Sequence, residues 1–106
     1  MHQRAQTIYQ IEQRTKGYNL YSQDAEENVR FLVKLYDLAK SGVWYIAEYD
    51  PQTHIAFGYV TGVSADDEWG YFDVEELISL MYLDGTRQRI RFSSRFTEIF
   101  ATEVIK

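Results

Sequence analysis

Residues 42–72 constrain the fold more than any other part of the chain. This stretch contains both tryptophans and has no lysine or arginine. Its segments 43–49 and 55–63 carry apolar side chains on both faces of an extended backbone, which predicts two strands at the centre of a sheet. Asp50 and Pro51 stand between them and favour a type I turn, because proline presets the required φ. The stretch therefore predicts a central hairpin, followed by a short strand over residues 68–72.

Two segments before this stretch also have a regular pattern. Residues 29–36 alternate, with Phe31 and Leu35 on the same face, which predicts one continuous half-buried strand. Residues 4–15 have apolar side chains at roughly helical spacing, with Gly17 as a plausible stop. We therefore expect an N-terminal helix and a strand that joins the central hairpin.

The C-terminal third predicts two more helices around one strand. Asp73 and Glu76 have the spacing of a capping box, so a helix should begin at Asp73 and end near Gly85. Residues 89–92 alternate and predict a short strand. Apolar residues share a helical stripe within residues 93–104, which predicts a last helix capped by a serine.

These elements predict one α+β domain over residues 1–106. We expect a twisted, mainly antiparallel sheet of about five strands, with two or three helices packed largely on one face. The chain length suits one domain. The absence of cysteine excludes disulfides and thiolate chemistry. The sequence shows neither a secretory signal nor an apolar run of membrane-spanning length, so a cytoplasmic location is expected.

Charge is distributed unevenly along the chain. Residues 37–84 contain ten acidic side chains and only one basic side chain, Lys40, whereas residues 85–106 carry a net positive charge. The net charge of the whole chain is −5. An acidic middle and a basic tail affect the choice of partner more than they affect the fold.

Three sequence blocks carry a family resemblance. They are Trp44-Tyr45 with Glu48 and Asp50; Phe57-Gly58-Tyr59-Val60; and Glu68-Trp69-Gly70-Tyr71-Phe72 followed by Glu75, Glu76 and Leu77. Over residues 18–101 the chain resembles an uncharacterised family of small bacterial proteins, domain of unknown function 2958. Residues 1–17 form a helical extension outside the resemblance. The resemblance implies a plasmid or phage setting, often near genes that act against host defence, and implies no catalytic residue.

The sequence offers little catalytic chemistry. Glu48, Asp50 and His54 flank one turn and could converge on a divalent metal. Hairpin ends usually carry such residues because they face water, and we expect no metal site. A nucleophile elbow, a phosphate loop and a dinucleotide fingerprint are all absent. We therefore expect neither cofactor nor catalytic residue, and a small enzyme of unknown reaction is a further alternative.

The acidic side chains suggest a binding function. The expected contact residues are Glu48, Asp50, Asp66, Asp67, Glu68, Trp69, Glu75 and Glu76. Such a carboxylate array could resemble a phosphate backbone and occupy a nucleic-acid-binding groove on a host protein. We therefore predict a non-enzymatic protein that binds, and could inhibit, a nucleic-acid-handling or defence complex. The partner's identity and the oligomeric state stay open.

Two further residue groups bear on binding. The arginines Arg87, Arg89, Arg91 and Arg95 could form a stripe that holds phosphates, which makes direct nucleic-acid binding the alternative function. The competing interpretation pairs these arginines with the acidic middle of the chain. The tyrosines Tyr21, Tyr45, Tyr49, Tyr59 and Tyr71 exceed the needs of one core, and those left exposed would be contact candidates.

Overall fold

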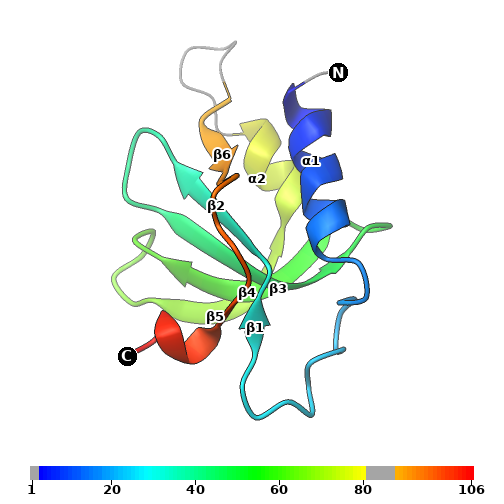
Figure 1. Ribbon diagram of the computed structural model, residues 1–106. Helices are drawn as coiled ribbons and strands as arrows, with labels where there is room; N and C mark the ends of the chain where they lie inside the picture. The colour runs from blue at the N-terminus through cyan, green and yellow to red at the C-terminus, as the bar shows by residue number, and fades with distance from the viewer. Residues whose placement is uncertain (1–2, 81–87) are drawn as a thin grey trace.

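The computed structural model describes residues 3–80 and 88–106 (Figure 1). In chain order, the elements of this part are α1 (Gln3–Arg14), β1 (Arg30–Phe31), β2 (Val33–Asp37), β3 (Val43–Asp50), β4 (Ile55–Thr61), β5 (Glu68–Asp73), α2 (Val74–Leu80), β6 (Ile90–Phe92), β7 (Ile99–Phe100) and the 3-10 helix η1 (Ala101–Glu103). None of the helices in this part is long and apolar enough to cross a membrane.

The strands form two antiparallel sheets. Five strands pair in the order β5-β4-β3-β2-β6, and β1 pairs with β7 in a separate two-stranded sheet. Helices α1 and α2 lie side by side on one face of the large sheet (Figure 1). This arrangement confirms the predicted α+β class, with the 43–61 hairpin inside the sheet and β5 at one edge.

The N-terminal helix belongs to the main core. Ile11 is fully buried between the helices and the sheet. At the helix end, the Thr15 hydroxyl donates to the Ile11 carbonyl at 2.8 Å, and Gly17 has a φ of +86°. The Tyr49 N–H then donates to the Tyr18 carbonyl at 2.9 Å, which joins the following loop to β3. The predicted helix is confirmed, and it is packed rather than loosely docked.

The strand predicted over residues 29–36 is interrupted at Leu32. The Leu32 N–H donates to the Ile46 carbonyl at 2.8 Å, and the chain changes sheets at this point. As a result, Phe31 is buried on the face away from the helices, whereas Val33 is buried beneath them. The apolar residues of this segment therefore belong to two cores on opposite faces of the sheet. The prediction of a single alternating strand was wrong.

The central hairpin contains a β-bulge. The register between β3 and β4 shifts between Ile46 and Glu48. The loop extends one residue beyond the predicted four-residue turn, since the His54 N–H donates to the Asp50 carbonyl at 2.8 Å. His54 has a φ of +64°, which is unusual for a residue other than glycine.

Helix α2 begins as the sequence predicts. A side-chain oxygen of Asp73 accepts the Glu76 N–H at 3.0 Å, which confirms Asp73 as the cap. Val74 and Ile78 of this helix are fully buried. The predicted end at Gly85 lies outside the described residues. Strand β6 confirms the strand expected over 89–92.

The helix predicted within residues 93–104 is wrong. This segment turns at residues 93–96 and then pairs through β7 with β1 before the short helix η1. Phe96, Ile99 and Val104 pack with Phe31 and Ala47 on the sheet face opposite α1 and α2. An extended chain rises about 3.3 Å per residue, so a few residues cover more of a sheet face than a helical turn would. The apolar residues that suggested a helical stripe therefore form a second hydrophobic core.

Candidate functional site

Glu48, the first residue of the expected contact set, lies inside the fold. It is only 2% exposed. Its carboxylate accepts the N–H of Tyr21 at 2.7 Å and the N–H of Gln23 at 2.8 Å. Gln23 in turn bonds the Ala47 carbonyl at 2.9 Å. Glu48 therefore holds the loop 18–28 against β3, and it cannot belong to an acidic surface.

Asp50 and His54 also point to separate partners. Asp50 accepts the Gln52 N–H at 2.9 Å. The two ring nitrogens of His54 lie 2.8 Å from the Tyr49 hydroxyl and 3.3 Å from a Glu75 carboxylate oxygen. Across residues 3–80 and 88–106, no group of three histidine, aspartate or glutamate side chains is arranged to hold a metal ion. The three turn residues do not form one site.

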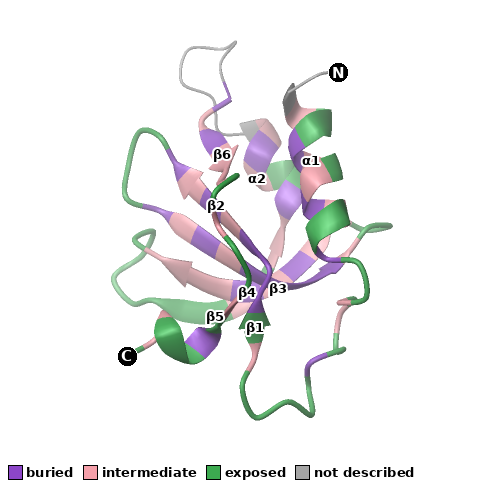
Figure 2. Cartoon of the chain, in the orientation of Figure 1, coloured by how far each residue is buried: buried purple, intermediate pink, exposed green. Residues whose placement is uncertain are grey.

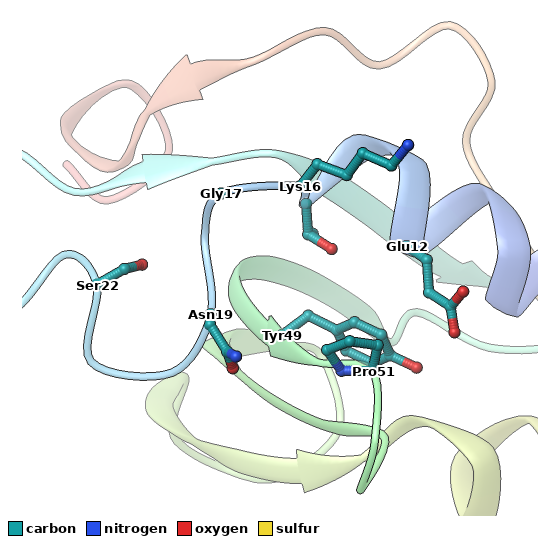
Figure 3. Close-up of a pocket in the computed structure, with 8 residues that line it drawn as sticks. Glu12, Lys16, Gly17, Asn19, Ser22, Tyr49 and Pro51 are labelled. Atoms are coloured by element: carbon teal, nitrogen blue, oxygen red, sulfur yellow. The ribbon is translucent and has the colours of Figure 1, made fainter.

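A hollow of about 280 Å³ lies beside this turn. Figure 3 shows the Glu12 side chain of α1 pointing toward Tyr49 and Pro51 of the hairpin, whereas Lys16, in the turn after α1, extends away from them. Burial raises the pKa of the Tyr49 hydroxyl, and the negative charge of Glu12 raises that pKa further. The hydroxyl therefore stays protonated at neutral pH, and the hollow lacks an activated nucleophile at this position.

Two arginines of the predicted stripe, Arg89 and Arg91, make hydrogen bonds within the fold. Arg89 makes two hydrogen bonds to the Asp37 carboxylate, at 2.7 and 2.8 Å, which confirms the pairing with the acidic middle segment. Arg91 donates to the Gln88 carbonyl at 2.9 Å. Arg95 is exposed, and Arg87 lies outside the described residues. Among the three described arginines, Arg89 and Arg91 bond within the fold and only Arg95 remains exposed, so these three do not form one stripe.

The Asp37–Arg89 pair should make the free energy of unfolding depend on pH. The hydrogen bond from Arg89 lowers the pKa of Asp37 below its ordinary value. The resulting stability is present above the unfolded-state pKa of about 3.9, and is lost as pH falls through the lower folded-state value. Thermal unfolding, followed by circular dichroism from neutral to strongly acidic pH, measures this effect. The melting temperature of Asp37→Asn should fall less with decreasing pH than that of the wild type. Asp66→Asn, an exposed control, should follow the wild-type profile, and an unchanged Asp37→Asn profile would contradict this role.

The remaining acidic contact candidates are exposed in two places. Asp66, Asp67 and Glu68 lie in the β4–β5 turn and at the start of β5. The Gly62 N–H donates to Asp67 at 3.2 Å, which orders the turn. The other exposed group comprises Glu75 and Glu76 in the first turn of α2. Strand β5 therefore has carboxylates near both of its ends.

Aromatic rings form a continuous row beside this acidic turn. Trp69 lies 5.4 Å from Tyr59 and 5.6 Å from Phe57, measured between ring centroids. Phe57 then lies 4.9 Å from Tyr71, and Tyr71 lies 6.5 Å from Tyr21. Trp69, Tyr71 and Tyr21 are 39%, 54% and 63% exposed. The sequence indicated Trp69 as a member of the contact set, and Tyr21, Tyr59 and Tyr71 as contact candidates if exposed. Sequence reasoning missed Phe57, for which the period-two spacing at 57/59 and 69/71 was the available signal.

Strand β5 is an edge strand of the large sheet in the described part of the chain. β5 pairs only with β4 among the described residues, and Figure 2 shows it as mostly exposed or half-buried. A hollow of about 230 Å³ follows the strand between Val63 and Phe72. At Gly70, an added Cβ would meet no heavy atom within 4 Å. We define the β5 surface as this edge with half-buried Phe57 and the exposed aromatic and acidic neighbours Tyr21, Asp66, Asp67, Glu68, Trp69 and Tyr71.

Comparisons with known proteins identify no relative. No protein-family model, no curated protein and no solved structure matches the chain. The resemblance described for residues 18–101 therefore stays a prediction, and the functional argument depends on the geometry of the chain.

Proposed function

We propose that the chain is a non-enzymatic binding protein, and that its β5 surface attaches to a protein partner with a basic surface. The observation that carries this proposal is the exposed aromatic row on a free edge strand, next to an acidic turn. Trp69 and Tyr71 offer a large contact area with few rotatable bonds. Asp66, Asp67 and Glu68 favour a partner of positive charge.

Strand addition is the binding mode that this surface supports. No strand within residues 3–80 and 88–106 pairs with the outward backbone groups of β5, and an extended segment could use these groups as a template. Side chains of that segment could contact Tyr71 on one face and enter the space beside Gly70 on the other. A basic extended segment therefore fits both the edge and its charges.

A second copy of the chain fits this edge less well. An antiparallel pairing of two β5 strands would bring Asp67 and Glu68 of one copy near Asp73 of the other. Like charges directly across a strand pair are destabilising. Charge complementarity therefore favours a basic partner over self-association.

The family resemblance supports the same proposal. A protein from a plasmid or phage could use the β5 surface to occupy a basic groove on a host defence or nucleic-acid-handling protein. In this proposal the carboxylates take the place of phosphates, and complementary charge accelerates the encounter. Direct nucleic-acid binding receives less support, because Arg89 and Arg91 are used within the fold.

Capture from host lysate tests this proposal. Neutralising the turn with Asp66→Asn, Asp67→Asn and Glu68→Gln should reduce capture of the specific partner roughly tenfold at low salt, because the charge attraction is removed. Tyr71→Ala should weaken capture by about tenfold at any salt concentration, as expected for an interface anchor. Quantitative mass spectrometry of the captured proteins measures both effects.

The matched control changes charge equally at other sites. Glu12→Gln, Glu26→Gln and Glu103→Gln alter the net charge by the same amount and lie outside the β5 surface. This variant should capture the partner as well as the wild type does. An equal loss of capture in both triple variants, or full capture by Tyr71→Ala, would contradict the proposal that the β5 surface binds the partner.

A further inference from the structure

A second candidate site lies at the opposite end of the sheet, around β2 and β6. Lys34, Tyr36, Phe92, Ser93, Ser94 and Arg95 line an open hollow of about 420 Å³. None of these lining residues is acidic, although the chain carries a net charge of −5. The hollow therefore differs in charge from the β5 surface.

The alternation of β2 places two of the lining side chains. Val33 and Leu35 are fully buried beneath the helices, so Lys34 and Tyr36 point to the other face of the sheet. Tyr36 is in register with Arg91 of β6, which adds a third polar side chain on that face. The strand pattern thus brings cationic and hydroxyl groups to one end of the sheet.

The rim of the hollow is held in place by hydrogen bonds. The Ser93 N–H donates to the Lys34 carbonyl at 2.9 Å, and the Phe96 N–H donates to the Ser93 carbonyl at 3.3 Å. Arg14 reaches from α1 and donates to the Phe96 carbonyl at 2.7 Å and to the Ser94 carbonyl at 3.4 Å. The 93–96 turn is therefore positioned before any ligand arrives, which lowers the ordering cost of binding.

Two cationic side chains, Lys34 and Arg95, line the hollow. Arg95 is exposed, and Lys34 lies over the Tyr45 ring with its Nζ 5.9 Å from the ring centroid. Within the described part of the chain, no acidic side chain forms an ion pair with either of them. By contrast, Arg30 pairs with Glu98. The hollow thus combines two positive charges, which no described acidic side chain pairs with, and the hydroxyls of a tyrosine and two serines.

From this arrangement we propose that the hollow binds a phosphate group of a small molecule. A guanidinium and an ammonium bind phosphate oxygens through charge-assisted hydrogen bonds. Serine and tyrosine hydroxyls can donate to further oxygens of the same group. A long nucleic acid is disfavoured, because its other phosphates would meet a predominantly acidic protein. The site is independent of the proposed function, since it shares no residue with the β5 surface.

A nuclear magnetic resonance titration of the full chain with inorganic phosphate tests the proposal. At constant ionic strength, amide shifts should change and saturate at Lys34, Tyr36 and residues 93–95. Arg95→Gln and Lys34→Gln should each weaken binding at least about fivefold, as expected when a charge-assisted hydrogen bond is lost. Lys40→Gln removes a charge outside the hollow and should leave the affinity unchanged.

Several results would overturn the proposal. One is an absence of saturable shifts at the hollow. Another is an equal affinity for phosphate in Arg95→Gln, Lys34→Gln and the wild type. A parallel titration with a short single-stranded DNA distinguishes the source of the phosphate. Shifts at the hollow that saturate with DNA but not with inorganic phosphate would reject a small-molecule ligand and favour a nucleic-acid site.

Discussion

Gly58→Ala should destabilise the protein by more than about 4 kcal/mol, which is a large part of the stability of a domain of this size. A Cβ added at Gly58 would overlap the carbonyl oxygen of Tyr45 in the neighbouring strand. This contact lies beside the β-bulge of β3, in the middle of the sheet, where neither backbone can move without disturbing its other neighbours. Urea denaturation followed by far-ultraviolet circular dichroism measures the loss.

Gly70→Ala is the matched control for this substitution. Gly70 is in register with Gly58 across the β4–β5 pair. A Cβ added at Gly70 would meet no heavy atom within 4 Å. The control should be neutral or more stable by a few tenths of a kcal/mol, because alanine restricts the unfolded chain more than glycine does. Equal destabilisation of the two variants would show that the approach of Gly58 to Tyr45 does not govern stability.

Glu48→Ala should cost about 3 kcal/mol, because two N–H groups lose their buried acceptor. The carboxylate holds the N–H groups of Tyr21 and Gln23, and it is itself 2% exposed. Without it, the loop 18–28 should separate from β3, and amide hydrogen exchange in that loop should accelerate. Tyr21 belongs to this loop, so the substitution should also reduce partner capture through the β5 surface.

Two variants make this result specific to Glu48. Glu48→Gln keeps one acceptor oxygen in place and should lose about half as much stability. Glu68→Ala removes an exposed carboxylate and should change stability by less than about 0.5 kcal/mol. Similar unfolding curves for Glu48→Ala and Glu68→Ala would contradict the assignment of Glu48 as the anchor of the loop.

Much of the fold could be predicted from local patterns. Apolar side chains on both faces, with a turn signal between them, identified the two strands of the central hairpin, and Asp73 identified the start of α2. These signals are local, because side-chain periodicity and helix capping depend on neighbouring residues. The same reasoning failed over 93–104, where the spacing of Phe96, Ile99 and Val104 suits a helix but the side chains cover a second face of the sheet.

The candidate site could be predicted only in part. The sequence indicated acidic turns and surplus aromatics, and Asp66, Asp67, Glu68 and Trp69 are exposed together at β5. It assigned the same role to Glu48, which is buried. Exposure depends on what packs above a residue, and for Glu48 that is a loop distant in sequence from β3. Similarly, the sequence suggested Arg89 as part of a basic stripe, whereas in the fold it is bonded to Asp37.

The sequence alone established that this chain forms an α+β domain with a central antiparallel hairpin and an acidic middle segment. Those properties follow from composition and from periodicity over a few residues. Tertiary packing set the outer edge of β5, the aromatic row from Trp69 to Tyr21 and the basic hollow around Arg95. Each of these features brings together residues that are far apart along the chain. Strand order and side-chain burial therefore distinguish the carboxylates that can meet a partner from Glu48, which maintains the fold.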